Sequence, residues 1–246
     1  MQKIPLYWQD PYMKELDSTV LSVSGEGEKS GKVVVLDKTI FYPEGGGQPS
    51  DFGVLRKENG EEFNVLFSGK SDGNVFHEVD KSGLSAGDKI HGTINWERRY
   101  KLMRMHTTMH LFCNIFTQDQ QVRITGNQLG PDESRVDVAL ENFSKEKVQK
   151  FVDTANSYIQ QKLPVKSYFV PIEDAKKDPT LFRVATELYQ KIDEMRVVEI
   201  EGVDKEADGG THVKNLEEIG KIVLVKIDNK GKDRKRIYFR LEKLFS

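Results

Sequence analysis

Residues 96–117 read WERRYKLMRMHTTMHLFCNIFT, and this stretch divides the chain into two parts of different composition. It contains no glycine or proline and is rich in Leu, Met and Phe, which predicts a buried helix. The residues before it form short strand-like runs separated by turn-forming stretches, and such spacing favours a small β-barrel or sandwich. We therefore predict an α+β protein with a β domain, a small barrel or a sandwich, at residues 1–95 and an α+β domain at residues 96–246.

Sequence patterns predict further elements in both parts. In the first part, strand-like runs lie at residues 32–37, 62–67, 74–79 and 89–95. In the second part, residues 121–140 return to strands and turns, and further strands are expected at residues 165–171, 196–200, 221–227 and 236–241. Apolar residues at helical spacing follow Ser144, a residue type suited to an N-cap, and predict an amphipathic helix closed by Pro164. Asp178-Pro179 resembles a second helix start.

The composition is that of a globular protein with a sizeable core. The chain has 246 residues, of which 37% are hydrophobic and 31% charged. No apolar run approaches the roughly 20 residues of a membrane span, and the N-terminus has no secretory signal pattern. The single cysteine, Cys113, excludes a disulfide framework and any zinc site with two or four cysteines. We expect a cytoplasmic protein.

The charge is unevenly distributed along the chain. The net charge is −2, so the chain as a whole does not have the basic character of a nucleic-acid binder. From Lys221 to Lys243, however, nine basic residues accompany three acidic ones, which gives this segment a charge of +6. Such a segment is either a solvated basic hairpin or a binding site for a polyanion.

Two histidines occupy the predicted helix at a spacing that suits a metal ion. His106 and His110 are four residues apart, so their imidazoles project from one helical face. Zincin metalloproteases carry a glutamate directly after the first histidine, and Thr107 at that position argues against their mechanism. The alternative is a pair of buried histidines without a ligand. Cys113 lies near the same face, either as a nucleophile or ligand or, more commonly, as a small buried residue.

Asp208-Gly209-Gly210-Thr211-His212 is a second stretch with potential ligands. Its two glycines allow a tight turn or a close approach of the backbone to a ligand. Asp208 and His212 can supply an oxygen and a nitrogen, which with the histidine pair would complete a set acceptable for zinc. The alternative is an ordinary turn in which the aspartate accepts a hydrogen bond from its own backbone.

A glycine-rich stretch, TIFYPEGGGQPSD, spans Thr39 to Asp51. Three successive glycines can bring backbone N–H groups against a ligand. No Gly-Lys-Ser/Thr follows, so the stretch is not a Walker loop, and it does not fit the dinucleotide-binding fingerprint. The polar residues around the glycines favour a ligand-reading loop over an inert hairpin tip.

Taken together, these stretches resemble the editing domain of alanyl-tRNA synthetase. The matching segments are Arg98-Arg99 with Met105–Leu111 as the first zinc motif, Gly126–Asp132 with Arg135–Asp137, Arg196–Val198 with Asp208–Val213 as the second zinc motif, Thr39–Asp51 as the glycine-rich motif, and Lys230–Ile237 as the final basic strand pair. The order is that of the family, and the match runs from about Val33 to Leu241. The chain is most similar to the AlaX family of free-standing alanyl-tRNA editing proteins, in its medium-length form.

This resemblance implies a fold and an activity. The fold is a barrel followed by an α+β editing domain of the threonyl/alanyl-tRNA synthetase second-additional-domain type. The activity is hydrolysis of mischarged Ser-tRNA(Ala), with Gly-tRNA(Ala) as a further substrate, which makes the protein an aminoacyl-tRNA hydrolase. At 246 residues the chain has no room for an aminoacylation domain as well, so editing would occur in trans.

The resemblance also implies the site residues. One Zn²⁺ per chain would be held by His106, His110, Asp208 and His212. Thr39 and Gln48 would contact the substrate, with the Thr39 hydroxyl reading that of serine. Phosphates of the tRNA(Ala) acceptor stem would be bound by six basic residues: Arg98, Arg99, Lys230, Lys232, Arg234 and Arg236. No membrane and no protein partner are expected.

One position departs from the family pattern. The second zinc motif of the family begins with cysteine, whereas this chain has Asp208 there. A carboxylate is a harder ligand than a thiolate, so the substitution bears directly on metal affinity. It leaves open a tRNA-binding module with a degenerate metal site and no activity. Another metal-dependent hydrolase, such as an amidase or peptidase, is the remaining alternative.

Overall fold

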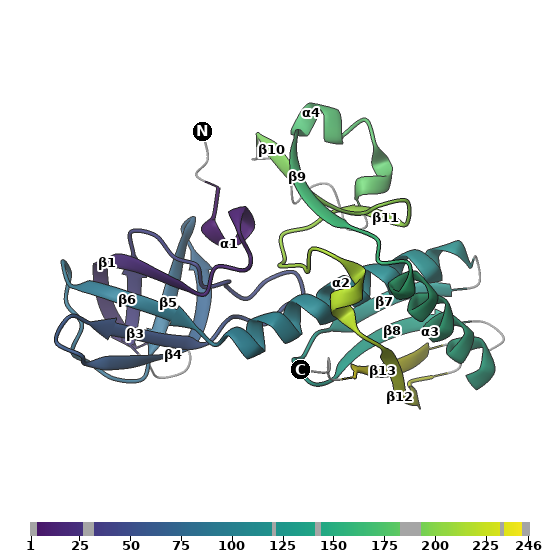
Figure 1. Cartoon of the computed structure of the whole chain (residues 1–246), viewed down its shortest axis with the longest axis horizontal. Coiled ribbons are helices and arrows are strands. Elements are labelled where there is room, and N and C mark those ends of the chain that lie inside the picture. Colours follow the sequence, from purple (N-terminus) through teal and green to yellow (C-terminus); the bar gives the residue numbers. More distant parts are fainter. Residues whose placement is uncertain are drawn as a thin grey trace. The chain divides into compact units, whose positions relative to one another are not determined.

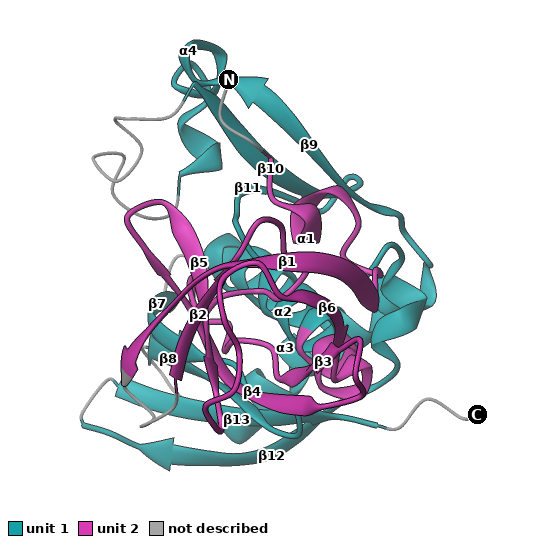
Figure 2. Cartoon of the chain, turned by 90° about the vertical axis from the view of Figure 1, so that its left-hand side faces the viewer, with its two compact units in different colours: residues 1–2, 103–246 teal, residues 3–102 magenta. Residues whose placement is uncertain are grey.

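The chain divides into two compact units that meet inside one helix. The computed structural model describes residues 4–26, 32–119, 122–140, 144–182, 193–231 and 234–242 (Figure 1). The units comprise residues 3–102 and 103–246 (Figure 2). Helix α2, Trp96–Gln118, begins in the first unit and continues into the second, and its bounds confirm the helix predicted over residues 96–117. The division thus falls a few residues inside this helix, whereas the sequence analysis placed the boundary at its start.

The first unit is a closed six-stranded barrel with the strand order β1-β2-β5-β4-β3-β6. All neighbouring strands are antiparallel. The elements are α1 (Leu6–Gln9), β1 (Glu15–Glu26), β2 (Lys32–Leu36), β3 (Gly53–Lys57), β4 (Glu62–Ser71), β5 (Asn74–Val79) and β6 (Lys89–Ile94). Inward side chains of the strands, among them Val20, Val34, Leu55, Phe63 and Ile90, form one apolar cluster together with Phe41 of the segment between β2 and β3. This architecture confirms the predicted barrel.

Two barrel strands were not predicted from the sequence. Strand β1 is rich in serine and carries exposed Leu21 and Val23, so it shows no clean alternation of apolar and polar residues. It is nevertheless hydrogen-bonded on both sides, to β2 and to β6. Strand β3 likewise lies between β4 and β6. Barrel closure gives every strand two neighbours, and pairing rather than side-chain pattern forms these two strands.

The second unit contains two antiparallel sheets. One has three strands in the order β11-β10-β9 and the other four in the order β12-β13-β8-β7. The strands are β7 (Val122–Gln128), β8 (Ser134–Leu140), β9 (Val165–Pro171), β10 (Glu194–Ile200), β11 (Asp204–Ala207), β12 (Ile222–Asn229) and β13 (Arg234–Leu241). Among the described residues of this unit, the helices beside α2 are α3 (Lys145–Gln160) and α4 (Ile172–Ala175), with 3-10 turns at Pro179–Leu181 and Leu216–Ile219. None of the described helices is long and apolar enough to cross a membrane.

One face of the four-stranded sheet packs against α2 and α3. The ring of Phe112 on α2 lies 4.9 Å from that of Phe239 on β13, and Phe116 lies 5.1 Å from Phe151 on α3. Along β8, burial alternates strictly, with every second side chain from Ser134 to Leu140 in the core. The intervening side chains therefore face the opposite side of the sheet, away from the helices.

The helix caps and the amphipathic helix that the sequence predicts in the second unit are present in the structure. Ser144 caps α3, because its hydroxyl accepts a hydrogen bond of 3.0 Å from the Lys147 amide. The helix buries Val148, Val152, Ala155 and Ile159, which share one face at helical spacing. Asp178 caps the 3-10 turn that follows it, with its carboxylate 3.2 Å from the Thr180 amide. The chain after Phe182 lies outside the described residues up to residue 192.

A buried ion pair joins the start of α2 to the glycine-rich loop of the barrel unit. Arg99 and Asp51 are both completely buried and in direct contact. Arg99 also donates to the carbonyls of Pro11 at 2.8 Å and Ile40 at 2.6 Å, and Asp51 accepts from the Tyr42 amide at 2.7 Å. A side chain without exposed surface does not reach a phosphate, so the RNA contact expected of Arg99 is replaced by a structural role.

Candidate metal centre

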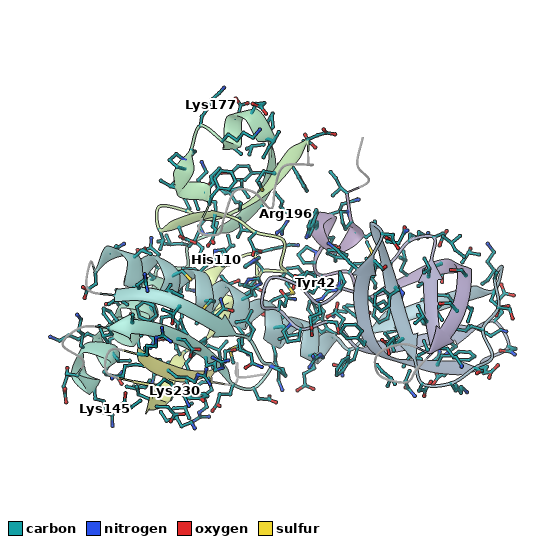
Figure 3. All side chains as sticks on the ribbon, turned by 180° about the vertical axis from the view of Figure 1, so that it is seen from behind. Tyr42, His110, Lys145, Lys177, Arg196 and Lys230 are labelled. Atoms are coloured by element: carbon teal, nitrogen blue, oxygen red, sulfur yellow. The ribbon has the colours of Figure 1, made fainter. Side chains whose placement is uncertain are left out.

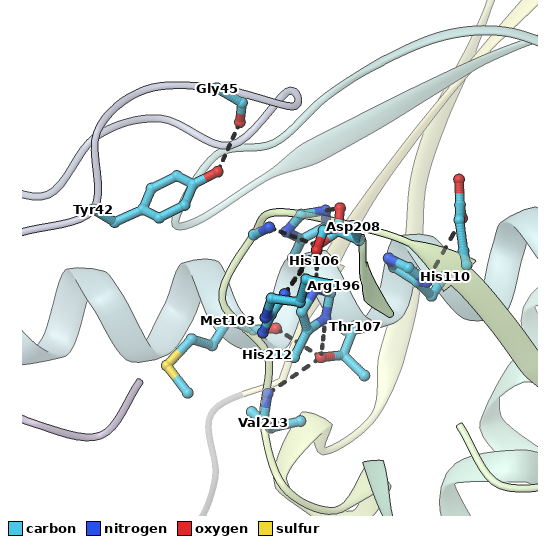
Figure 4. A network of polar contacts seen from close by, with 12 residues as sticks. Tyr42, Gly45, Met103, His106, Thr107, His110, Arg196, Asp208, His212 and Val213 are labelled. Atoms are coloured by element: carbon cyan, nitrogen blue, oxygen red, sulfur yellow. Dashed lines mark hydrogen bonds and ion pairs between the residues drawn. The ribbon is translucent and has the colours of Figure 1, made fainter. Parts of the chain in front are cut away.

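Three imidazoles and one carboxylate converge in the second unit. His106 and His110 come from successive turns of α2, with ring centroids 5.5 Å apart. Asp208 and His212 come from the loop that follows β11, and the ring of His212 lies 4.4 Å from that of His106 (Figure 4). One ligand atom from each of the four residues lies within 4.8 Å of all the others. The four residues that the sequence analysis named as ligands are thus adjacent.

The orientation of His212 is set by Thr107. The Thr107 hydroxyl donates its proton to the Met103 carbonyl at 3.0 Å, so its oxygen acts as an acceptor towards its other neighbours. Nδ1 of His212 lies 3.2 Å from that oxygen and therefore carries the N–H that donates to it. In a neutral imidazole the proton on Nδ1 leaves Nε2 with a lone pair, directed at the cluster.

His110 is oriented in the same way by a carboxylate. Its Nδ1 lies 2.9 Å from Oδ2 of Asp204, the first residue of β11, and both side chains are buried. A carboxylate behind one ring nitrogen fixes the imidazole so that the other nitrogen can bind a metal. Glu206 stands farther away, with its carboxylate 3.8 Å from the same nitrogen.

The protonation states suit a cation. Burial lowers the pKa of His106 to about 4, and the charge of Asp208 opposes this only in part. Burial and the neighbouring His106 hold the pKa of His212 well below its usual range. Burial opposes the charged form of Asp208, but the surrounding histidines outweigh it and keep the pKa of this carboxyl well below its ordinary value. His106 and His212 are therefore neutral and Asp208 is ionised at neutral pH, as metal ligation requires.

The arrangement of Asp208 and His212 fits a bound cation. Nε2 of His212 lies 2.9 Å from Oδ2 of Asp208. With the proton of His212 on Nδ1, these two atoms are both hydrogen-bond acceptors, and a cation between acceptors removes their repulsion. Nitrogen and carboxylate oxygen at four positions make a donor set that zinc accepts. The geometry admits a divalent metal.

Asp208 also accepts a hydrogen bond from a nearby backbone amide, as expected if this stretch were an ordinary turn. Its Oδ2 accepts a hydrogen bond of 2.6 Å from the Gly210 amide. Arg196 of β10 donates to the Asp208 backbone carbonyl at 2.8 Å, and its guanidinium lies 3.9 Å from the carboxylate. The turn and the ligand interpretations are therefore compatible, because the turn is what presents the carboxylate. Cys113 belongs to neither of the two groups of possible ligands found among the described residues, which are His106, His110, Asp208 and His212 and, around the same histidine, His110, Asp204 and Glu206.

The two residues expected at the substrate lie in the barrel unit. Thr39 is partly exposed, and its hydroxyl oxygen lies 2.8 Å from Nε2 of His77. Gln48 is completely buried, and its backbone pairs with Gly45 on both sides of the turn, at 3.1 and 3.0 Å. Gly46 and Gly47 within this turn have φ values of 60° and 82°, which glycine adopts without strain. These are bonds of the Gln48 backbone, and the substrate contact expected of its side chain stays a prediction.

The basic residues differ in how they are placed. Arg98 is half-buried, stacks over the ring of Phe52 at 3.9 Å and donates to the Ser50 carbonyl at 3.1 Å. Lys230 and Arg234 are exposed at the β12–β13 hairpin, and Lys230 lies at the edge of the second unit, away from His110 (Figure 3). Arg236 is bound to both oxygens of Asp137, at 2.7 and 2.9 Å. Lys232 lies outside the described residues.

The sequence analysis missed three residues around these sites. Thr107 was noted only because it replaces the zincin glutamate, and Asp204 and His77 were given no role. Asp204 is separated from His110 by 94 positions, and His77 from Thr39 by 38. No local spacing signals contacts over such distances. Each of the three became visible only through its hydrogen bond.

Comparisons with known proteins identify both parts of the chain. A family model described as threonyl and alanyl tRNA synthetase second additional domain matches residues 195–238, which span β10 to most of β13. A model described as tRNA synthetases class II (A) matches residues 13–98, which form the barrel. The matches confirm the predicted fold class.

Full-length relatives are similar throughout. The alanyl-tRNA editing protein AlaX-M of Methanosarcina barkeri is 49% identical over 242 residues, covering 96% of this chain and 98% of that protein. AlaX-M of Saccharolobus solfataricus is 39% identical, with 96% and 98% covered. The alanine–tRNA ligase of Methanococcus maripaludis strain C7 is 38% identical, over 91% of this chain but only 24% of the ligase. The chain therefore belongs to the AlaX-M family of alanyl-tRNA editing proteins.

Proposed function

We propose that this protein hydrolyses the ester bond of mischarged Ser-tRNA(Ala) in trans, with a divalent metal, zinc in the first place, at the cluster of His106, His110, Asp208 and His212. The observation that carries the proposal is the convergence of these four ligand atoms within 4.8 Å, in a chain whose full-length relatives are named alanyl-tRNA editing proteins. Gly-tRNA(Ala) is the second substrate to be compared.

A second, hydrolytic site is needed because the aminoacylation pocket discriminates poorly between alanine and similar amino acids. A pocket that accepts alanine does not exclude glycine, which is smaller, and rejects serine poorly because serine only adds a hydroxyl. Discrimination of this kind reaches roughly 10- to 200-fold. Hydrolysis of the wrong ester afterwards raises fidelity, and it needs no ATP because ester hydrolysis is favourable.

Some residues of the metal centre would hold the ion, and others would orient the residues that hold it. His106, His110, Asp208 and His212 would hold the ion, and Thr107 and Asp204 would orient two of the imidazoles through their Nδ1 atoms. A bound divalent ion supplies Lewis-acid polarisation of a carbonyl or a water molecule. The three histidine ligands are at most 5% exposed, so the fold also limits access of bulk water to this centre.

Selection between aminoacyl groups is assigned to Thr39. Thr39 is partly exposed, and its hydroxyl can form a hydrogen bond with the hydroxyl of serine. Alanine offers no such partner, and a polar group left unpaired costs about 1–3 kcal/mol. This role rests on the family resemblance of the glycine-rich motif and on the chemistry of the side chain.

The exposed face of the four-stranded sheet is the proposed binding surface for the tRNA backbone. A hollow of about 700 Å³ at the β7, β8 and β13 strands and the β12–β13 hairpin is lined by Arg123, Ile124, Thr125, Asp137, Lys230, Arg234, Lys235 and Arg236. Arg123 and Arg234 face the same side, because both pair with Ala139 in the register of β7, β8 and β13. Five basic side chains and one acidic one give the hollow a charge that suits phosphates. Arg123 thereby joins the residues named from the sequence.

The decisive experiment compares hydrolysis of Ser-tRNA(Ala) and Ala-tRNA(Ala) by the purified protein, with and without a chelator. We expect faster hydrolysis of the seryl ester, loss of activity with the chelator and recovery on adding Zn²⁺. His106→Ala and His212→Ala should abolish both metal binding and activity, whereas His91→Ala, a half-exposed histidine of the barrel, should leave both unchanged. A protein that binds metal and tRNA but hydrolyses neither ester would be a binding module.

A further inference from the structure

A buried histidine, His77, contacts the hydroxyl of Thr39 in the barrel unit. Thr39 follows the end of β2, and His77 lies in β5 opposite Val34 of β2. The Thr39 hydroxyl oxygen is 2.8 Å from Nε2 of His77. Thr39 is partly exposed, whereas His77 has no exposed surface. His77 therefore cannot touch a ligand itself and can act only through Thr39.

The contacts of His77 determine where its proton lies. Nδ1 is 3.2 Å from the backbone carbonyl of Val34. A carbonyl only accepts hydrogen bonds, so Nδ1 must carry the proton. A neutral imidazole has one N–H, and its second nitrogen, Nε2, is then an acceptor. The hydrogen bond between His77 and Thr39 consequently runs from the threonine hydroxyl to the histidine.

The neutral form of His77 is favoured by its surroundings. Burial lowers the pKa of His77 to about 4, and the hydrogen bond with the Val34 carbonyl opposes this only in part. The ring packs against that of Phe41 in a T-shaped arrangement, with centroids 5.3 Å apart. An apolar, closed environment of this kind keeps the proton arrangement the same at neutral pH.

The Thr39 hydroxyl can therefore act towards a ligand only as a hydrogen-bond acceptor. Its proton is directed to His77, and one of its two oxygen lone pairs accepts from the Phe41 amide at 3.1 Å. Among the contacts made by the described residues, the second lone pair of the hydroxyl oxygen remains for a ligand. A group that binds here must bring a proton of its own.

We propose that His77 is a positioning residue that fixes the Thr39 hydroxyl as a hydrogen-bond acceptor, and that this acceptor selects an aminoacyl group with a hydroxyl donor. The inference rests on the proposed function, because it concerns the substrate that Thr39 reads. The hydroxyl of serine supplies the required proton, whereas the methyl of alanine and the hydrogen of glycine do not. The site would therefore prefer the seryl ester to both the alanyl and the glycyl ester.

Two substitutions of His77 separate this role from a merely structural one. His77→Leu removes the acceptor, so the Thr39 hydroxyl is free to rotate and the ratio of seryl to alanyl hydrolysis should fall roughly 3- to 30-fold. His77→Gln offers an amide oxygen near the position of Nε2 and an N–H for the Val34 carbonyl, so it should retain most of the ratio. Thermal unfolding of each variant shows whether the barrel is intact.

A double-mutant cycle tests whether His77 acts through Thr39. Thr39→Val should lower the seryl-to-alanyl ratio by itself, roughly 5- to 100-fold. In the Thr39→Val background, His77→Leu should cause no further fall, because the hydroxyl that it positions is already gone. Independent, multiplicative effects of the two substitutions would overturn the proposal.

The proton arrangement can also be measured directly, without any variant. Nitrogen NMR of the full-length protein with labelled histidine distinguishes a ring protonated at Nδ1 from one protonated at Nε2. We expect His77 to be protonated at Nδ1 only at neutral pH, with Nε2 as an acceptor. A proton on Nε2 would reverse the direction of the Thr39 hydrogen bond and would overturn the proposal even if no variant folds.

Failure of this inference can be told apart from failure of the proposed function. A wild-type protein that hydrolyses no aminoacyl-tRNA would overturn the proposed function and the inference with it. A wild-type protein that prefers the seryl ester, together with a His77→Leu variant that folds and keeps the wild-type ratio, would overturn the role of His77 alone.

Discussion

Nδ1 of His110 lies 2.9 Å from Oδ2 of Asp204, and the two buried side chains join the middle of α2 to the start of β11. The contact directs the other ring nitrogen of His110 towards His106, Asp208 and His212. Burial opposes the charged form of His110, but the hydrogen bond with Asp204 and the neighbouring carboxylates outweigh it and raise the pKa of this histidine. Asp204 is therefore part of the candidate metal centre although it is not one of its four ligands.

The contribution of Asp204 can be measured as metal affinity. We expect Asp204→Asn to weaken Zn²⁺ binding roughly 10- to 100-fold, because the carboxylate that orients His110 and raises its basicity is lost. Competition against a chromogenic chelator gives the affinity. Glu206→Gln is the matched control, since its carboxylate stands 3.8 Å from the same nitrogen and should matter less. Equal affinities of wild type and Asp204→Asn would show that the carboxylate does not act on the metal.

Asp208 lies where the family resemblance implies a cysteine, and we expect the side chain at this position to set the affinity for Zn²⁺. Asp208→Cys should bind Zn²⁺ more tightly than wild type, because a thiolate is the softer ligand, and Asp208→Asn should bind it less tightly. The same competition assay and metal analysis of the purified variants give the order. Ser82→Cys, which adds a thiol at an exposed position of the barrel, controls for adventitious binding. An unchanged affinity in both Asp208 variants would remove Asp208 from the ligand set.

The basic face of the four-stranded sheet predicts a salt-dependent interaction with tRNA. Arg123→Gln and Arg234→Gln should each weaken binding and each lower the slope of log affinity against log salt by about 1. Filter binding at several salt concentrations gives both quantities. Arg56→Gln, an exposed arginine of the barrel that is paired with Glu62, is the control and should change neither. Slopes that stay at the wild-type value would place the tRNA elsewhere.

The buried pair of Arg99 and Asp51 predicts a large effect on stability. Asp51→Asn leaves a buried guanidinium without its counter-charge and should destabilise the protein by about 3–5 kcal/mol. Glu62→Gln breaks an exposed pair with Arg56 and should cost less than about 1 kcal/mol. Chemical denaturation followed by circular dichroism compares the two variants. A loss of similar size in both would contradict the structural role of Arg99.

The burial of His77 predicts a dependence of stability on pH. Burial lowers the pKa of His77 from 6.5 to about 4, so between these values the unfolded chain binds a proton that the folded chain does not. The free energy of unfolding therefore falls as the pH decreases through this range, by at most about 3 kcal/mol for this group. His77→Gln lacks the titrating group, so its destabilisation relative to wild type should shrink between pH 7 and pH 4.5. Urea denaturation at both pH values measures the difference, and a pH-independent difference would contradict it.

Much of the secondary structure followed from local patterns in the sequence. The absence of glycine and proline after Asn95 predicted α2, and Ser144 with the apolar spacing that follows it predicted α3. Strands β1 and β3 were missed because their side chains do not alternate clearly. Hydrogen bonds to neighbours on both sides form these strands, and the neighbours are known only once the barrel has closed.

The sequence by itself determined which side chains share a helical face or a turn: His106 with His110, and Asp208 with His212. Backbone geometry fixes such spacings over four residues whatever the rest of the chain does. Only the tertiary structure decided that these two pairs meet, that Asp204 supports His110, that Arg99 is buried against Asp51 and that His77 stands behind Thr39. These contacts join residues that are 38 to 105 positions apart in the sequence. Local conformation does not bring such residues together, and the packing of side chains inside each unit does.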